Sequence, residues 1–297
     1  MTKGSSVGKS SFPSKEGRAP WGKLLMAIPI VYSIIYAIAN LVVYCMQVPV
    51  ALDNDSQPKE ALEGALAYHF AWTFFCFFAP LLYAVPCGLA GELLVPDLSR
   101  LVLYMGATFM NGAFFEVLVG ATGESLLGRK VWSYQIWSKH QGYTSGVGAV
   151  MWPMYGFYLC LLHETLRKRG AHSMVHHPLC GGLLIGMDAM LLETLANTFS
   201  LANYNLYYFY YLAPDLHHFT SAEIFLPYVL CGTIGLMLLK QLDRPDSSKT
   251  TMRWLGVVFH LVGLLEVFAI RTDSIIPWNS CVEEPMVLHN QTIIPEF

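Results

Sequence analysis

Apolar runs of membrane-spanning length recur along this chain, and they constrain its fold more than any other feature. A helix needs about 20 mostly apolar residues to cross a hydrocarbon core of about 30 Å. We read about seven such runs, at roughly 24–48, 67–92, 101–123, 146–165, 178–200, 222–241 and 252–270. Only 13% of the residues are charged, whereas a soluble domain carries about 25%. We therefore expect an all-α, polytopic helical bundle that is integral to the membrane.

Basic residues predict the orientation of this bundle, because they are enriched in cytoplasmic segments. The N-terminal segment is rich in them, with Lys3, Lys9, Lys15, Arg18 and Lys23. We expect a disordered cytoplasmic tail over 1–23, a transmembrane domain over 24–270, and a luminal or extracellular tail over 271–297. The tail lacks the apolar region and cleavage site of a signal peptide, so the first apolar run can serve as a signal anchor. This indicates a multi-pass protein of the endomembrane system, such as the endoplasmic reticulum.

Few other motifs carry chemistry outside the apolar runs. Two glycosylation sequons begin at Asn54 and Asn290; both fall on the outer side in this topology, so we expect glycosylation there. The cysteines form no C-x-x-C pair, and the expected topology places the His-His pairs at 176–177 and 217–218 on opposite sides of the membrane. We therefore expect no metal site, no disulfide framework and no cofactor. Nothing in the sequence indicates nucleic-acid binding, and the expected partner is the lipid bilayer.

Two stretches of the chain repeat one arrangement: a glutamate deep in an apolar run, an aromatic loop, and a second run that opens on proline. The first has Glu116, the loop W-S-Y-Q-I-W and W-P-M-Y-G from Trp152; the second has Glu193, the loop Y-Y-F-Y-Y and L-P-Y-V-L-C-G from Leu226. Glutamate and proline are about 37 residues apart in one copy and about 34 in the other. A charge costs roughly 2.5 kcal/mol or more at the centre of a spanning helix. We therefore predict a duplicated two-helix unit whose glutamates face one shared interior cavity.

The acids in these runs have a structural and a functional interpretation. Glycines flank Glu116 on its own helix face and permit close packing, so Glu116 is either a hydrogen-bonded packing residue or a proton donor or ligand-binding acid. Asp188 lies nearer the middle of the membrane than Glu193 and on a different face, where a neutral acid would be a proton donor. Asn197 follows Glu193 by one turn and could hold its carboxyl group.

Short motifs in the repeat are similar to those of a known family. They are W-S-Y at 132–134, G-Y-T-S from Gly142, P-M-Y-G-F at 153–157, and Glu223 with P-Y-V-L-C-G at 227–232. Over these residues the chain resembles CmpB-type permeases and their small vertebrate transmembrane relatives, which implies a shared helical scaffold and transfers no catalytic residue. In size, number of spans and lack of a soluble part, the chain also looks like fungal membrane-bound terpene cyclases of the ascofuranone and macrophorin type. That likeness implies cyclisation of a farnesyl-bearing meroterpenoid after protonation of an epoxide or alkene.

These features favour a membrane terpene cyclase, of the isomerase or lyase class, that acts on a prenylated, farnesyl-type lipid. The candidate catalytic acids are Glu116, Asp188 and Glu193. Desolvated aromatic rings can stabilise a carbocation by about 2 kcal/mol or more each. The candidate rings are Trp72, Phe74, Phe75, Phe114, Phe115, Trp152, Tyr155 and Tyr228, and we expect Trp152, Tyr155, Tyr228 and Phe115 to contact the substrate.

The alternative function is a transporter or permease subunit. Internal repeats and carboxylates inside the membrane are typical of transporters. A scaffold or accessory subunit is a third interpretation. The sequence leaves the oligomeric state open.

Overall fold

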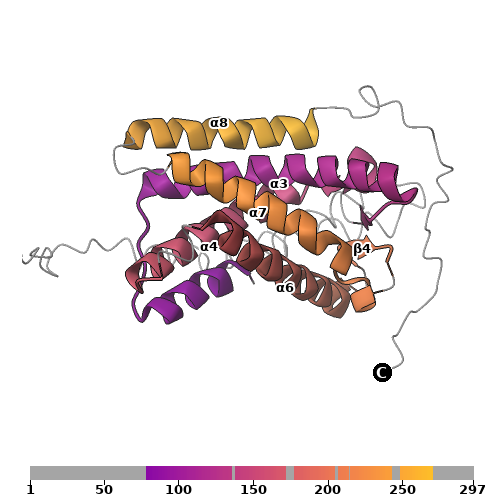
Figure 1. Ribbon diagram of the computed structural model, residues 1–297, viewed down its shortest axis with the longest axis horizontal. Coiled ribbons are helices and arrows are strands. Elements are labelled where there is room, and N and C mark those ends of the chain that lie inside the picture. The colour runs from indigo at the N-terminus through magenta and orange to yellow at the C-terminus, as the bar shows by residue number, and fades with distance from the viewer. Residues whose placement is uncertain are drawn as a thin grey trace, which may run out of the picture.

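The described part of the chain is mostly helical. The computed structural model describes residues 78–135, 138–171, 177–204, 207–213, 215–242 and 248–269. These residues form six helices, which are Phe78–Ala90, α3 (Leu98–Leu127), α4 (Gly148–Lys168), α6 (Pro178–Tyr204), α7 (Ala222–Leu242) and α8 (Lys249–Phe268) (Figure 1).

Four of these helices, α3, α6, α7 and α8, are long and apolar enough to cross a membrane. They coincide with four of the expected apolar runs. A fifth run forms α4, which ends on Arg167 and Lys168 and is not among those four helices. The second run is described only from Phe78. The first run, both tails and the sequons at Asn54 and Asn290 lie outside the described residues.

The outer surface of the long helices supports a membrane environment. Large apolar side chains stand exposed on each of them, among them Leu118, Leu126, Leu183, Leu191, Leu230, Ile234, Leu261 and Leu265. A soluble monomer rarely exposes so continuous an apolar surface. In a bilayer these side chains contact apolar lipid tails instead of water, so their exposure on the helix surface is not unfavourable.

Helix ends follow from local capping residues. The Asp97 side chain accepts a hydrogen bond from the Ser99 backbone N–H at 2.9 Å and begins α3. Gly128 ends α3 at φ 66°, a left-handed conformation that favours glycine. Lys249 donates to Asp97 at 2.7 Å, which joins the start of α8 to the start of α3.

Close packing holds α8 along α3 (Figure 1). A Cβ atom on Gly106 would lie 2.0 Å from the Gly256 carbonyl oxygen, so only glycine permits this approach. The helices α3 and α4 form one packed pair, and α6 and α7 form another.

Short strands join these two helix pairs at one end of the bundle. Strand β1 (Trp132–Tyr134) pairs antiparallel with β4 (Phe209–Tyr211), and Ser133 lies opposite Tyr210. Strand β2 (Ser138–Lys139) pairs with β3 (Thr144–Ser145). Strands β1 and β4 lie within the two aromatic loops of the sequence, which were expected to be loops only.

Successive helices run in opposite directions. One end of the bundle therefore carries the strands, and we call it the strand end; the other end carries a cluster of Lys and Arg, and we call it the basic end. The basic end holds the start of α3 and α8 and the end of α4, with Arg100, Arg167, Lys168, Arg169, Lys249 and Arg253. Ion pairs tie these segments together: Arg100 contacts Glu164 at 3.4 Å, and Lys168 contacts Glu92 at 2.8 Å.

Candidate functional site

Glu116 is buried in the half of α3 nearer the strand end, with 7% of its surface exposed. One carboxyl oxygen accepts a hydrogen bond from the Tyr134 hydroxyl, and the other accepts one from the Thr144 hydroxyl. Strands β1 and β3 therefore each contribute one donor to the same carboxyl group.

Glu193 on α6 has an equivalent set of donors. Its Oε1 accepts from the hydroxyls of Tyr211, at 2.6 Å, and Tyr228. Its Oε2 accepts from the Thr220 hydroxyl at 2.5 Å. The tyrosine of the strand follows its glutamate by 18 residues in both cases, and the threonine follows by 28 residues for Glu116 and 27 for Glu193.

The same unusual backbone turn places both threonines. His140, Gln141 and Gly142 have φ values of 51°, 58° and 91°, and they precede Thr144. Leu216, His217 and His218 have φ values of 45°, 54° and 62°, and they precede Thr220. Three successive left-handed residues are rare when most of them are not glycine.

Both glutamates line one cavity of about 100 Å³, which we call the paired-glutamate cavity. This is the shared cavity expected from the sequence. Its walls are mainly aromatic and thioether side chains, including Met151, Trp152, Met154, Tyr155, Phe209 and Tyr228.

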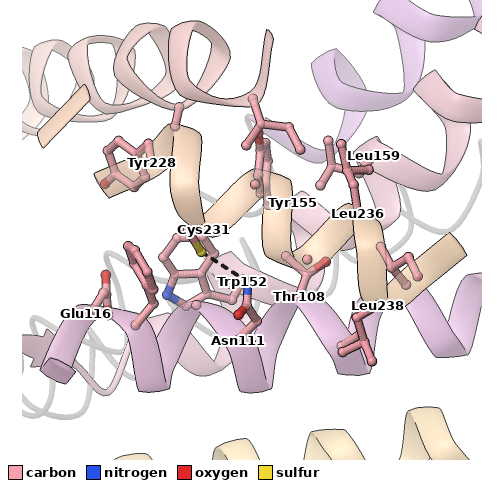
Figure 2. Close-up of a pocket in the computed structure, with 18 residues that line it drawn as sticks. Thr108, Asn111, Glu116, Trp152, Tyr155, Leu159, Tyr228, Cys231, Leu236 and Leu238 are labelled. Carbon is pink, nitrogen blue, oxygen red and sulfur yellow. Dashed lines mark hydrogen bonds between the residues drawn. The ribbon is translucent and has the colours of Figure 1, made fainter. Parts of the chain in front are cut away.

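A second cavity, of about 70 Å³, adjoins the first and shares Glu116, Trp152, Tyr155, Ala189 and Tyr228 with it. It extends away from Glu116 between α3 and α7, past Thr108 and Asn111 toward Leu238 (Figure 2). We call it the adjoining cavity.

The described residues that line these two cavities include no Lys, Arg or His. The donors to the two glutamates are neutral hydroxyls. Burial raises the pKa of the Tyr134 and Tyr211 phenols well above the usual value, and the neighbouring glutamates add to the shift. Both phenols therefore stay protonated and donate to the carboxyl groups.

Two further polar contacts cross between the helix pairs beside the cavities. Tyr155 and Tyr158 of α4 donate to Asp188 of α6 at 3.0 and 3.2 Å. Asn111 of α3 donates to the Cys231 sulfur of α7 at 3.1 Å (Figure 2). Each contact joins a helix of one pair to a helix of the other.

The structure brings together most of the residues singled out in the sequence. Glu116, Trp152, Tyr155 and Tyr228 line both cavities, Glu193 lines the paired-glutamate cavity and Phe115 lines the adjoining one. Asp188 is not among the lining residues and lies behind Tyr155.

Three aromatic candidates, Trp72, Phe74 and Phe75, fall outside the described residues. Phe114 is 56% exposed, so its proposed place among the interior rings is wrong.

The role expected for Asn197 is also wrong. Its amide donates to the backbone carbonyls of Phe209 and Phe219, each at 2.9 Å, and its oxygen accepts from the Tyr208 backbone N–H at 3.0 Å. Asn197 thus fixes the second aromatic loop, and the loop in turn places the Tyr211 hydroxyl on Glu193.

Sequence reasoning missed the hydroxyl donors Tyr134, Thr144, Tyr211 and Thr220. The equal spacing of each strand tyrosine from its glutamate was the available signal. Among the described residues, no three His, Cys, Asp or Glu side chains gather as a metal site would require. No protein-family model, curated protein or solved structure matches this chain at a significant level.

Proposed function

We propose that the protein is a membrane permease, in which a duplicated helix pair holds two carboxyl groups in one site for a cation. The duplication is the first step of this proposal. The tyrosine follows its glutamate by 18 residues in both copies, and the threonine follows by 28 residues in one and 27 in the other. These spacings support the duplication, and so do the matching left-handed turns before the threonines.

The strand register supports a two-fold relation between the copies. In β1 and β4, Trp132 lies opposite Tyr211 and Tyr134 lies opposite Phe209. A two-fold rotation about the midpoint between Ser133 and Tyr210 exchanges the two strands. It maps the pair Trp132–Tyr211 onto the pair Phe209–Tyr134. Parallel repeats related by an axis along the membrane normal occur in transporters, and antiparallel strands at one end of the bundle fit such an axis.

The chemistry of the paired-glutamate cavity carries the proposal. A buried charge is costly unless it is paired or neutralised, and none of the described residues that line this cavity is basic. Each glutamate is therefore suited to hold a proton or another cation. Two such groups in one cavity form a site whose occupancy and charge change together.

The adjoining cavity supports movement of a cation rather than simple storage. It continues from Glu116 toward Ala107, which is about 14 Å along α3 at the helical rise of about 1.5 Å per residue. The two cavities thus follow the space between the helix pairs from the strand end toward the basic end.

The proposal is tested with purified full-length protein in liposomes, in which cation currents are recorded on a solid-supported membrane. Protons, Na⁺, K⁺ and small organic cations are applied in turn. We expect current for at least one of them, and a loss of about tenfold or more, equivalent to about 1.4 kcal/mol, when Glu116→Gln and Glu193→Gln are combined.

Glu223→Gln is the matched control, because Glu223 is exposed at the strand end, where it pairs with Arg129. Its current should equal that of the unchanged protein. If liposomes with the protein give no more current than protein-free liposomes for any of the cations, the result contradicts the permease proposal.

The aromatic walls of the paired-glutamate cavity favour a second candidate, the membrane terpene cyclase. Rings around an acid suit a carbocation. Two features weigh against it: the hydroxyls already occupy the carboxyl oxygens, and a cavity of about 100 Å³ is small beside ligand pockets of roughly 300–1,000 Å³. Incubation with farnesylated phenols and epoxides, followed by mass spectrometry, tests it; a product lost in Glu116→Gln, Asp188→Asn or Glu193→Gln would establish the cyclase.

A further inference from the structure

We propose that the paired-glutamate cavity binds a compact organic cation of the quaternary ammonium class, such as tetramethylammonium or the choline head group. This inference rests on the proposed function, and it narrows the cation to one chemical class. It is argued from the hydrogen bonds of the two glutamates, the rings around them and the size of the cavity.

The first step concerns the carboxyl oxygens, all four of which accept hydrogen bonds from the protein. Tyr134 and Thr144 occupy the two oxygens of Glu116, and three hydroxyls occupy those of Glu193. These hydroxyls leave fewer free lone pairs for a primary ammonium group, whose N–H groups each need an acceptor, than an unpaired carboxylate would. A quaternary ammonium ion has no N–H group and needs only the negative charge nearby.

The second step concerns Ca²⁺ and Mg²⁺. These ions take about six or more oxygen ligands, from the protein and from water. The described walls of the paired-glutamate cavity are mainly apolar, and the glutamate oxygens already have hydroxyl donors. A cation that carries its own methyl surface needs no such ligands.

The third step concerns the aromatic walls. The Trp152 and Tyr155 rings meet at 69° with centroids 6.2 Å apart, and the Tyr134 and Tyr208 rings meet at 70° with centroids 5.2 Å apart. Both pairs meet edge to face, and all four residues line the cavity. Faces of Trp and Tyr attract quaternary ammonium ions through cation–π interactions.

The fourth step concerns size. The volume of about 100 Å³ suits a compact head group and not a long chain. The adjoining cavity, of about 70 Å³, has polar side chains in Thr108 and Asn111. A short substituent with a hydroxyl group, as in choline, can extend there.

The experiment measures binding to full-length protein in detergent by titration calorimetry. The ligands are tetramethylammonium, choline, the less methylated amines, Na⁺, and 3,3-dimethylbutan-1-ol, the uncharged carbon analogue of choline. We expect affinity to fall by about tenfold or more from choline to ethanolamine and from choline to the carbon analogue. Equal binding of the carbon analogue, or tighter binding of ethanolamine or Na⁺, would overturn the inference.

Substitutions test the contributions of the aromatic rings and of the glutamate charges to choline binding separately. Trp152→Leu should weaken choline binding about tenfold or more, and Trp254→Leu, at a 66% exposed position on α8, should leave it unchanged. Glu193→Gln should weaken choline but not the carbon analogue. If Trp152→Leu does not fold, Tyr155→Leu replaces it; unchanged choline binding in the folded ring variant would overturn the inference.

Binding and transport can fail separately. Choline binding without cation current in liposomes supports the inference and contradicts the permease. Cation current without choline binding supports the permease and overturns the inference. A quaternary ammonium ion also resembles a carbocation, so choline binding together with conversion of a farnesylated substrate supports the inference and assigns the site to the cyclase.

Discussion

At the scale of single residues, the two glutamates depend on hydroxyl groups from outside their own helices. Tyr134 and Tyr211 approach their glutamates from the paired strands. A hydrogen bond to a charged group contributes about 1.5–3 kcal/mol. The hydroxyls therefore link the position of each strand to the state of the carboxyl group beneath it.

We predict that Tyr134→Phe and Tyr211→Phe each lower the free energy of unfolding by about 1.5–3 kcal/mol. Each variant keeps the ring and removes one donor from a buried carboxyl group. The midpoint of thermal unfolding in detergent measures the effect. Tyr210→Phe is the control, because Tyr210 points to the other face of β4 and stacks on His218.

A double-mutant cycle sharpens this prediction. Tyr134→Phe should be non-additive with Glu116→Gln, its hydrogen-bond partner, and the Tyr211 substitution with Glu193→Gln. Equal losses in Tyr134→Phe and Tyr210→Phe, with full additivity to Glu116→Gln, would contradict the assigned donor role.

At the scale of elements, strands β1 and β4 connect the α3–α4 pair with the α6–α7 pair. Trp132 donates to the Tyr143 carbonyl at 2.9 Å and fixes the first loop, whereas Asn197 fixes the second. Different residues thus hold equivalent loops. The paired strands cover the strand end of the paired-glutamate cavity, since Tyr134, Tyr208 and Phe209 are among its lining residues.

We predict that Ser133→Cys with Tyr210→Cys forms a disulfide, because these residues are direct partners in the antiparallel pair. Opposite Cα atoms lie about 4.5–5.5 Å apart, within the range for a disulfide. Non-reducing electrophoresis after cleavage at an inserted protease site between the cysteines detects the bond. Ser133→Cys with Leu212→Cys is the out-of-register control; equal cross-linking of both pairs would contradict the register.

The helices could be predicted from the sequence, and the strand pairing could not. Long apolar runs have few solutions in a membrane, so α3, α6, α7 and α8 fall where the runs do. The shared cavity could also be predicted, because Glu116 and Glu193 lie at matching depths in their apolar runs. The partners Tyr134 and Tyr211 could not, because aromatic residues in such loops are also expected as interface anchors, and the register of β1 on β4 depends on contacts between distant segments.

At the scale of the whole molecule, charge is distributed unequally between the two ends. The basic end carries Arg100, Arg167, Lys168, Arg169, Lys240, Lys249 and Arg253, and the strand end carries Arg129, Lys130 and Lys139. An excess of Lys and Arg marks the cytoplasmic side. The paired-glutamate cavity would then lie nearer the outer side, and the adjoining cavity would extend toward the cytoplasm.

We predict that the basic end faces the cytoplasm, and single cysteines test this. Thr250→Cys lies at the basic end and Ser125→Cys at the strand end, both exposed. The exposed native Cys180 and the other native cysteines are first replaced by serine. In cells whose plasma membrane alone is permeabilised, an impermeant maleimide should label Thr250→Cys.

Ser125→Cys should react either from outside intact cells, if the protein lies in the plasma membrane, or only after internal membranes are dissolved. The two cysteines serve as controls for each other, because both positions are exposed and differ only in their end of the bundle. Labelling of Ser125→Cys from the cytoplasm, with Thr250→Cys protected, would show that the orientation in the membrane is the opposite of the predicted one. The paired-glutamate cavity would then lie nearer the cytoplasm, and a cation from the outer side would meet the adjoining cavity first.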